Sequence, residues 1–160
     1  MNSSQFNNIV KDFSDILYRY CIMMVKNRCL SQDIVQDSFL SLWKNHNNVE
    51  YEKAKSYLIS TAYHIIVSCR RKMNVKSKYV EEIEEEVSNN EYNGSTEAIN
   101  YYLNKLPKKY KDALVLRDMQ GYSYQEIASI MDYSVENVKI TIYRARKMMK
   151  GFIINKENII

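Results

Sequence analysis

The sequence predicts an all-α protein with two small helical domains joined by a flexible acidic linker, and three observations support this. Only three Gly and one Pro occur in 160 residues, far below the typical combined share of roughly 12%, which excludes turn-rich sandwiches and barrels. Apolar residues recur at spacings of three and four. Charge divides the chain: residues 1–80 hold 12 Lys and Arg against 6 Asp and Glu, residues 81–100 none against 7, and residues 101–160 11 against 6. Two basic modules suggest a polyanionic partner, nucleic acid or an anionic membrane surface.

The first two helices follow from apolar periodicity and a candidate cap. Apolar positions from Phe6 to Met24 predict an amphipathic helix ending near Arg28. Ser31 is the expected N-cap of a second helix over about 32–45, because its side chain can accept a bond from a free amide. Five positions of that helix should face inward: Ile34, Val35, Ser38, Phe39 and Leu42.

A polar stretch over 45–48 predicts a loop, and a third helix should run from about 53 to 72. Its buried side should hold Leu58, Ala62, Ile65, Ile66 and Cys69. Its outer side should hold Lys53, Ser56, Ser60, Tyr63, His64, Val67 and Arg71. Cations beside an aromatic ring suit unpaired nucleic acid, although Tyr63 and His64 equally suit an ordinary surface.

The pattern fails over residues 73–95, which we expect to be a linker. Few large apolar residues occur there, and Glu81–Glu86 contains a run of like charge. Such a segment buries too little apolar surface to offset its ordering entropy.

The second domain should begin at Thr96, a candidate N-cap, with its core started by Ala98, Ile99, Tyr102 and Leu103. Pro107 suits the first turn of the next helix, and Gly121 suits the left-handed residue at its end. Ser123 should cap a short helix, with Glu126 at the capping-box position.

Ser134 should cap a last helix over 135–150, so that residues 124–150 form a helix-turn-helix. At 100° per residue, one side of this helix carries Val135, Val138, Ile142, Ala145 and Met149. The other side carries Glu136, Lys139, Ile140, Tyr143, Arg144 and Lys147. We favour DNA binding by this second face over a solvated face that binds nothing.

No residue pattern argues for catalysis, a cofactor, a metal or a small-molecule substrate. Cys21, Cys29 and Cys69 lack ligand spacing and are expected to be buried free thiols. The N-terminus lacks a signal-peptide pattern, and the longest charge-free stretch, 56–69, is too short to cross a bilayer. A cytoplasmic location is therefore expected.

Motifs in both halves resemble bacterial RNA polymerase sigma factors. The stretch from Asp33 to Trp43, DIVQDSFLSLW, followed by YLISTA at 57–62 and RRK at 70–72, resembles their second conserved region. Leu106-Pro107, GYSYQEIA at 121–128 and Arg144-Ala-Arg146 resemble their fourth region. A chain with only these two regions resembles the extracytoplasmic-function group.

The resemblance implies domains at 1–72 (region 2, a three-helix bundle) and 96–150 (region 4, the helix-turn-helix), an acidic linker at 73–95 and an apolar tail at 151–160. It implies binding of core RNA polymerase and of promoter DNA, and restraint by an anti-sigma factor. Core polymerase binding is implied for Asp33, Gln36, Asp37 and Leu40. Capture of the opened promoter strand is implied for Asn47, Asn48, Lys53, Ser60, Tyr63, His64 and Arg71. Reading of the distal duplex element is implied for Asn137, Lys139, Ile140, Tyr143, Arg144 and Lys147.

Three departures from the family pattern stand out. Tyr63-His64 replaces the more usual Arg or Lys followed by Asn. Met131-Asp132 replaces Leu-Gly at the turn, which should be retained because Asp tolerates a left-handed backbone. Ile140 is apolar where a polar reader is common, which suggests contact with a thymine methyl group.

Several alternatives stay open from sequence alone. A stand-alone helix-turn-helix regulator would bind its operator without polymerase, and a helical adaptor would have no nucleic-acid role. The acidic linker either follows the path of nucleic acid, as in the family, or simply keeps the chain solvated, which we favour. The apolar tail should pack on the C-terminal module, although it also suits docking of a regulator.

Overall fold

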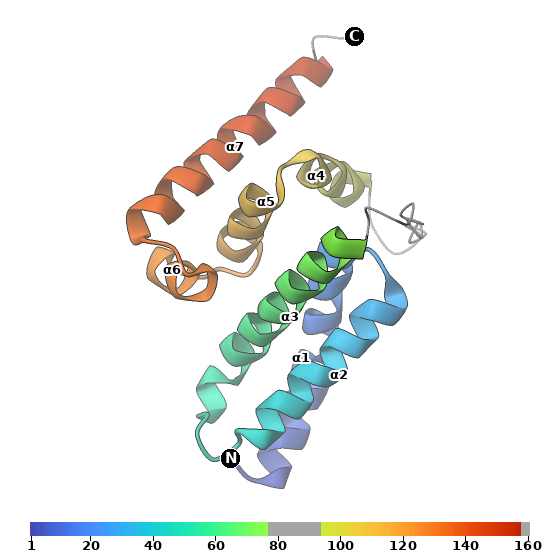
Figure 1. Ribbon diagram of the computed structural model, residues 1–160, viewed down its shortest axis with the longest axis vertical. Coiled ribbons are helices and arrows are strands. Elements are labelled where there is room, and N and C mark those ends of the chain that lie inside the picture. Colours follow the sequence, from blue (N-terminus) through green and yellow to red (C-terminus); the bar gives the residue numbers. More distant parts are fainter. Residues whose placement is uncertain (77–93, 158–160) are drawn as a thin grey trace. The chain divides into compact units, whose positions relative to one another are not determined.

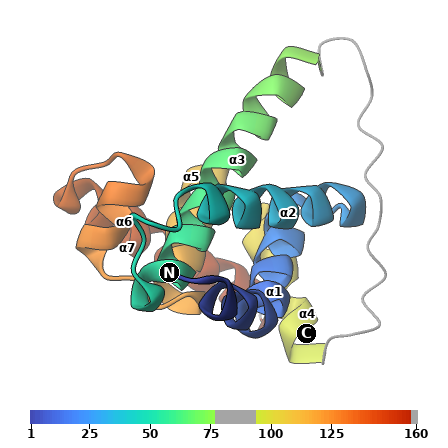
Figure 2. The ribbon, with the colours of Figure 1, turned by 90° about the horizontal axis from the view of Figure 1, so that it is seen from below.

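The computed structural model describes residues 1–76 and 94–157, and every regular element in these two ranges is a helix (Figures 1 and 2). The chain divides into two compact units, residues 1–88 and 89–160. This confirms the predicted all-α class with two helical domains. The acidic run at 81–86 lies outside the described residues.

The first unit is a bundle of three long helices, each in contact with the other two. They are α1 (Ser3–Val25), α2 (Arg28–Lys44) and α3 (Ala54–Lys76), with a 3₁₀ turn, η1 (Tyr51–Lys53), before α3. Figure 1 shows them side by side. The core is built from the apolar stripes that the periodicity predicts, including Ile9, Leu17, Ile34, Leu42 and Leu58, each at most 1% exposed. Burial of such stripes stabilises the bundle.

The junction between α1 and α2 corrects two predictions. α1 ends at Val25, three residues before the expected Arg28, because Lys26 adopts a left-handed conformation with φ 54°. Asn27, not Ser31, caps α2, and its side chain accepts a hydrogen bond from the Leu30 amide at 2.9 Å. Ser31 lies inside α2 and is fully buried. Both residues are good caps, so the left-handed residue before Asn27 decides which one is used.

The second unit contains α4 (Gly94–Lys105), α5 (Lys108–Leu114), a short π-helix η2 (Val115–Met119), α6 (Tyr124–Met131) and α7 (Val135–Glu157). α5 and α6 pack against α7, as Figure 1 shows. α4 begins two residues before Thr96, so Thr96 is not its cap. Ile99, predicted in the core, is 47% exposed.

The helix that begins with α5 ends in a π-helix, η2, which was not predicted. From Val115 the backbone follows a π pattern, and the Gln120 amide donates to the Val115 carbonyl at 3.0 Å. Gly121 then adopts φ +75°, the left-handed conformation predicted for it. A π-turn has no distinct hydrophobic period, so periodicity gives no signal for it.

The helix-turn-helix follows its predicted caps closely. The Ser123 hydroxyl oxygen accepts from the Glu126 amide at 3.1 Å and donates to the Glu126 carboxylate at 3.0 Å. The Ser134 hydroxyl accepts from the Asn137 amide at 3.1 Å. Asp132 adopts φ 58° and ψ 46°, so the left-handed turn is retained. α7 continues to Glu157, seven residues beyond the predicted end.

The three thiols differ in their surroundings. Cys21 is buried as predicted, whereas Cys29 is exposed and Cys69 is half-buried. Cys29 lies in the first turn of α2. Within the described ranges no helix combines the length and hydropathy needed to cross a membrane.

Candidate nucleic-acid interface

The outer face of α7 presents all six residues predicted to read duplex DNA. Each of them is exposed, with Ile140 at 48% and Tyr143 at 67%. Val138, Ile142 and Ala145 on the opposite side are at most 1% exposed. A helix with one side anchored in a core and the other carrying cations and a few uncharged side chains matches the geometry of a recognition helix. The predicted helical wheel of α7 is therefore confirmed.

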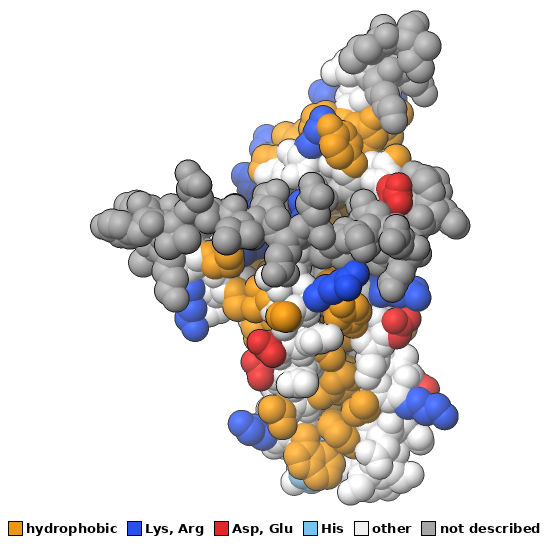
Figure 3. Space-filling model, turned by 90° about the vertical axis from the view of Figure 1, so that its right-hand side faces the viewer, with side chains coloured by type: hydrophobic (Ala, Val, Ile, Leu, Met, Phe, Trp, Pro, Cys, Tyr) orange, Lys and Arg blue, Asp and Glu red, His pale blue; other side chains and the backbone are white. Residues whose placement is uncertain are grey.

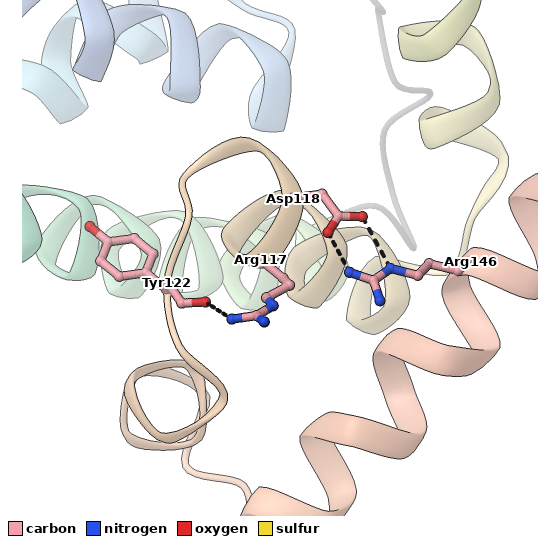
Figure 4. Close-up of polar contacts among 4 residues, drawn as sticks. All are labelled: Arg117, Asp118, Tyr122 and Arg146. Carbon is pink, nitrogen blue, oxygen red and sulfur yellow. Dashed lines mark hydrogen bonds and ion pairs between the residues drawn. The ribbon is translucent and has the colours of Figure 1, made fainter.

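A cation–aromatic cluster of Arg117, Tyr124 and Lys139 lies next to the outer face of α7. The Tyr124 ring lies near two cations, with the Arg117 guanidinium carbon 4.2 Å and the Lys139 ammonium 5.8 Å from the ring centroid. Arg117 also donates to the Tyr122 carbonyl at 2.9 Å (Figure 4). The ring of α6 thus restricts the side chain of Lys139 on α7.

A second polar contact joins α7 to η2. Arg146 donates to both oxygens of Asp118, through Nη2 at 2.5 Å and Nε at 3.3 Å (Figure 4). The hydrogen bond that Arg146 donates to Asp118 is the main cause of a raised pKa of Arg146. Both side chains are nearly half exposed, so solvent screens the pair and its contribution to stability is small. Its bidentate geometry joins the side chains of η2 and α7.

The loop between α2 and α3 holds Asn47 and Asn48 at the surface, as predicted. The Tyr57 hydroxyl lies 2.8 Å from both Ser41 Oγ and Asn45 Nδ2, so it joins the two ends of this loop. The His46 ring stacks on Trp43 with centroids 4.6 Å apart. Lys53, at the end of η1, forms an exposed ion pair with Glu50 at 3.8 Å.

Fewer residues are exposed on the outer side of α3 than predicted. His64 and Arg71 are exposed and Ser60 is half-buried, but Tyr63 is only 7% exposed. The placement of Tyr63 on the outer side was therefore wrong. Ile59, which the predicted stripe omitted, is buried, and Tyr63 lies one helical turn after it. The Tyr63 ring meets His64 edge-on, with centroids 5.5 Å apart.

The exposed side of α2 carries all four residues predicted to contact core polymerase. Asp33, Gln36 and Asp37 are exposed, and Leu40 is 55% exposed. Gln36 and Leu40 also line an apolar groove of about 740 Å³ between α1 and α2. Its other lining residues include Phe6, Val10, Val35, Phe39 and Trp43. Figure 3 shows a band of hydrophobic side chains over this part of the molecule. An exposed apolar groove of this kind is a candidate protein-docking surface.

Comparison with known proteins identifies the family. Residues 96–149 match the family described as Sigma-70, region 4. RNA polymerase sigma factor SigV of Bacillus subtilis (strain 168) is 30% identical over 146 residues, which cover 88% of this chain and 86% of SigV. ECF RNA polymerase sigma factor SigM of the same organism is 23% identical over 151 residues, which cover 91% of this chain and 93% of SigM.

The chain belongs to the extracytoplasmic-function (ECF) RNA polymerase sigma factors. This family is non-enzymatic and directs RNA polymerase in the initiation of transcription, which is the function of this chain. The fold agrees. The structure of the sigma factor RpoE in complex with the anti-sigma factor NepR from Bartonella quintana matches with a TM-score of 0.76 at 19% identity, covering 92% of this chain and 96% of RpoE.

Some candidate interface residues of this sigma factor were missed in the sequence. Phe6, Val10 and Trp43 line the α1–α2 groove, but Phe6 and Val10 were interpreted only as part of an amphipathic stripe, and Trp43 only as part of the family motif. Trp43 follows Gln36 by seven positions and Leu40 by three, and this spacing places all three on one side of α2. No sequence pattern identified Tyr124 as part of this interface, because its contacts are with cations that are distant in sequence.

Proposed function

We propose that this sigma factor divides promoter recognition between its two units while core polymerase supplies the chemistry. The observation that carries the proposal is the separation on α7 of a buried apolar side from an exposed side that carries Lys139, Arg144 and Lys147. A sigma factor of this kind has no active site of its own. Most of its affinity for DNA comes through the polymerase, so the free chain binds DNA poorly.

The outer face of α7 is the proposed reader of the distal duplex element. Lys139, Arg144 and Lys147 contact phosphates, which gives affinity and register. Asn137, Ile140 and Tyr143 reach base edges in the major groove, with Ile140 against a thymine methyl group. The Tyr124 ring keeps Lys139 close to the surface of α6, which lowers the entropy lost when it binds a phosphate.

The α2–α3 loop and the outer side of α3 are the proposed site for the opened strand. Asn47 and Asn48 offer amide groups to an unpaired base, His64 offers a ring, and Lys53 and Arg71 offer cations to the backbone. Ser60 borders this surface. Because Tyr63 is buried, we assign it to the support of His64 rather than to stacking on a base. Extrusion of a base costs a few kcal/mol, which polymerase binding offsets.

The exposed side of α2 is the proposed contact with core polymerase, through Asp33, Gln36, Asp37 and Leu40. The adjacent groove supports this, since it adds apolar area to a face that carries two carboxylates. A partner helix with apolar residues on one side and cations beside them would complement both features.

Regulation and location follow from the same proposal. RpoE binds an anti-sigma factor in its crystal structure, and we propose that an anti-sigma factor restrains this chain in the same way. The chain works in the cytoplasm, where promoter DNA is. Region 2 was expected at 1–72, a linker at 73–95, region 4 at 96–150 and a tail at 151–160, but α3 extends to Lys76, α4 begins at Gly94 and α7 continues to Glu157. We therefore propose that region 2 includes all of α3 and that region 4 extends from α4 to the end of α7.

Transcription in a purified system tests the proposal. The chain is added to purified bacterial core polymerase with a library of upstream sequences, and transcripts are sequenced. We expect initiation at a small set of related promoters. Absence of sequence-dependent transcripts, or tight operator binding by the free chain, would favour a stand-alone regulator instead.

A further inference from the structure

The loop between α2 and α3 is held at both ends by one tyrosine hydroxyl that has no direct part in the proposed interface. We propose that Tyr57, together with Asn45, is a positioning residue for strand capture: it fixes the loop that presents Asn47 and Asn48. This inference rests on the proposed role of that loop in binding the opened strand.

The first anchor is the hydroxyl group of Tyr57. It lies 2.8 Å from Ser41 Oγ in the last turn of α2 and accepts a hydrogen bond from Asn45 Nδ2 at 2.8 Å. The same Asn45 amide also donates to the Ser41 carbonyl at 3.0 Å. One hydroxyl in the first turns of α3 therefore joins α3 to the last turn of α2 and to the first residue of the loop.

The second anchor is His46. Its ring stacks on Trp43 at an interplanar angle of 15°, and its Nδ1 lies 2.6 Å from the Trp43 carbonyl. Backbone hydrogen bonds also hold the loop. The His46 amide donates to the Trp43 carbonyl at 3.2 Å, and the Asn48 amide donates to the Asn45 carbonyl at 2.9 Å. Among the described residues, nothing is hydrogen-bonded to the side chains of Asn47 and Asn48, which are exposed.

This arrangement prepares the loop before DNA arrives. A loop free to sample many conformations would lose backbone entropy when it closes on a flipped base, and that loss lowers affinity. Binding groups held by supporting hydrogen bonds avoid most of it. Because the Tyr57 hydroxyl is half-buried and already hydrogen-bonded to Ser41 and Asn45, we infer that it acts through the loop and not by contact with DNA.

The test uses Tyr57→Phe in the full-length chain, assembled with core polymerase. Loss of the hydroxyl removes both anchoring bonds but keeps the ring. We expect the rate of promoter opening to fall roughly three- to tenfold, while affinity for core polymerase and for the duplex element stays unchanged. In the free chain, amide hydrogen exchange at His46 and Asn48 should accelerate. Tyr18→Phe is the matched control, because the described part of the chain shows no hydrogen bond to the Tyr18 hydroxyl.

A second variant and a separate pair of substitutions distinguish the outcomes. Asn45→Ala leaves the aromatic ring intact and should reproduce the effect of Tyr57→Phe on loop exchange and on opening. Asn47→Ala and Asn48→Ala test the proposed role of the loop itself: if they leave opening unchanged, that role is wrong. If they impair opening but Tyr57→Phe changes neither opening nor exchange, the positioning role is overturned. An equal loss in opening, polymerase affinity and duplex affinity in Tyr57→Phe also overturns it, since this indicates general destabilisation.

Discussion

Two neighbouring residues on α7, Lys139 and Ile140, show how single side chains divide affinity from specificity. Both are exposed on the same face of one helix. An ammonium group attracts phosphates of any sequence and releases counterions when it binds. An aliphatic side chain gains free energy only where a base presents a methyl group.

Lys139→Ala should therefore weaken promoter binding by the holoenzyme and reduce the slope of log K against log salt by about 0.9. Ile140→Ala should leave that slope unchanged and reduce the preference for thymine at one position by about 1 kcal/mol. Salt titrations of binding to promoter variants measure both effects. Lys11→Ala, an exposed cation on α1, is the control. Equal salt slopes for Lys139→Ala and wild type would show that α7 presents a different face to DNA.

The three cysteines show how burial alone separates identical side chains. Burial raises the pKa of Cys21 from its ordinary 9.0 to about 12, because desolvation disfavours the thiolate. Cys29 is exposed. Since the thiolate is the nucleophile, the exposed Cys29 should react more readily than the buried Cys21.

We expect iodoacetamide at pH 8 to alkylate Cys29 in the folded chain and to leave Cys21 unmodified, as read by peptide mass spectrometry. In urea both should react at similar rates. The raised folded-state pKa also means that the stabilising contribution of the neutral Cys21 thiol is complete below pH 9 and decreases as the pH rises towards about 12. Alkylation of Cys21 before Cys29 in the folded state would contradict this.

At the scale of elements, the sequence was most informative where local chemistry is unambiguous. Ser123, Ser134 and Gly121 were placed correctly because a cap or a left-handed glycine depends on neighbouring residues only. The start of α2 was wrong because two suitable caps compete and Lys26, an unusual left-handed residue, decides between them. Tyr63 and Ile99 were misplaced because the width of a buried stripe depends on packing partners that periodicity does not reveal.

The helix α6 provides a direct test of this local chemistry. Ser123→Ala removes the acceptor for the Glu126 amide and should lower the free energy of unfolding by about 1 kcal/mol. Ser129→Ala, at an exposed position inside the same helix, should have no effect or stabilise slightly, because Ala has the higher helix propensity. Urea unfolding of the full chain measures both variants. Equal effects of the two substitutions would mean that the cap contributes nothing.

At the scale of the whole molecule, the net charge does not reveal that basic and acidic residues are segregated along the chain. The formal charge of +4 is the remainder of two basic segments and one acidic segment between them. Neither the groove nor the cation–aromatic cluster follows from these charges, because both combine residues from different helices. The family could be predicted from motifs in both halves, whereas the groove required the packing of α1 against α2.

This groove gives a prediction for assembly with polymerase. Leu40→Ala should weaken binding of core polymerase by about 1–2 kcal/mol, because Leu40 is exposed and lines the groove. Ile16→Ala removes a similar exposed aliphatic side chain from α1 outside the groove and should leave affinity unchanged. Fluorescence anisotropy with labelled chain measures both. A loss confined to Ile16→Ala would place the docking surface elsewhere.

The groove also has an optical consequence. Trp43 is the single tryptophan of the chain, it is 39% exposed, and it lines the groove beside Leu40 while stacking on His46 of the loop. A partner seated in the groove would displace water from the indole and shift its emission to shorter wavelength. The sigma factor therefore carries a built-in reporter at the boundary between its proposed polymerase-binding and strand-binding surfaces.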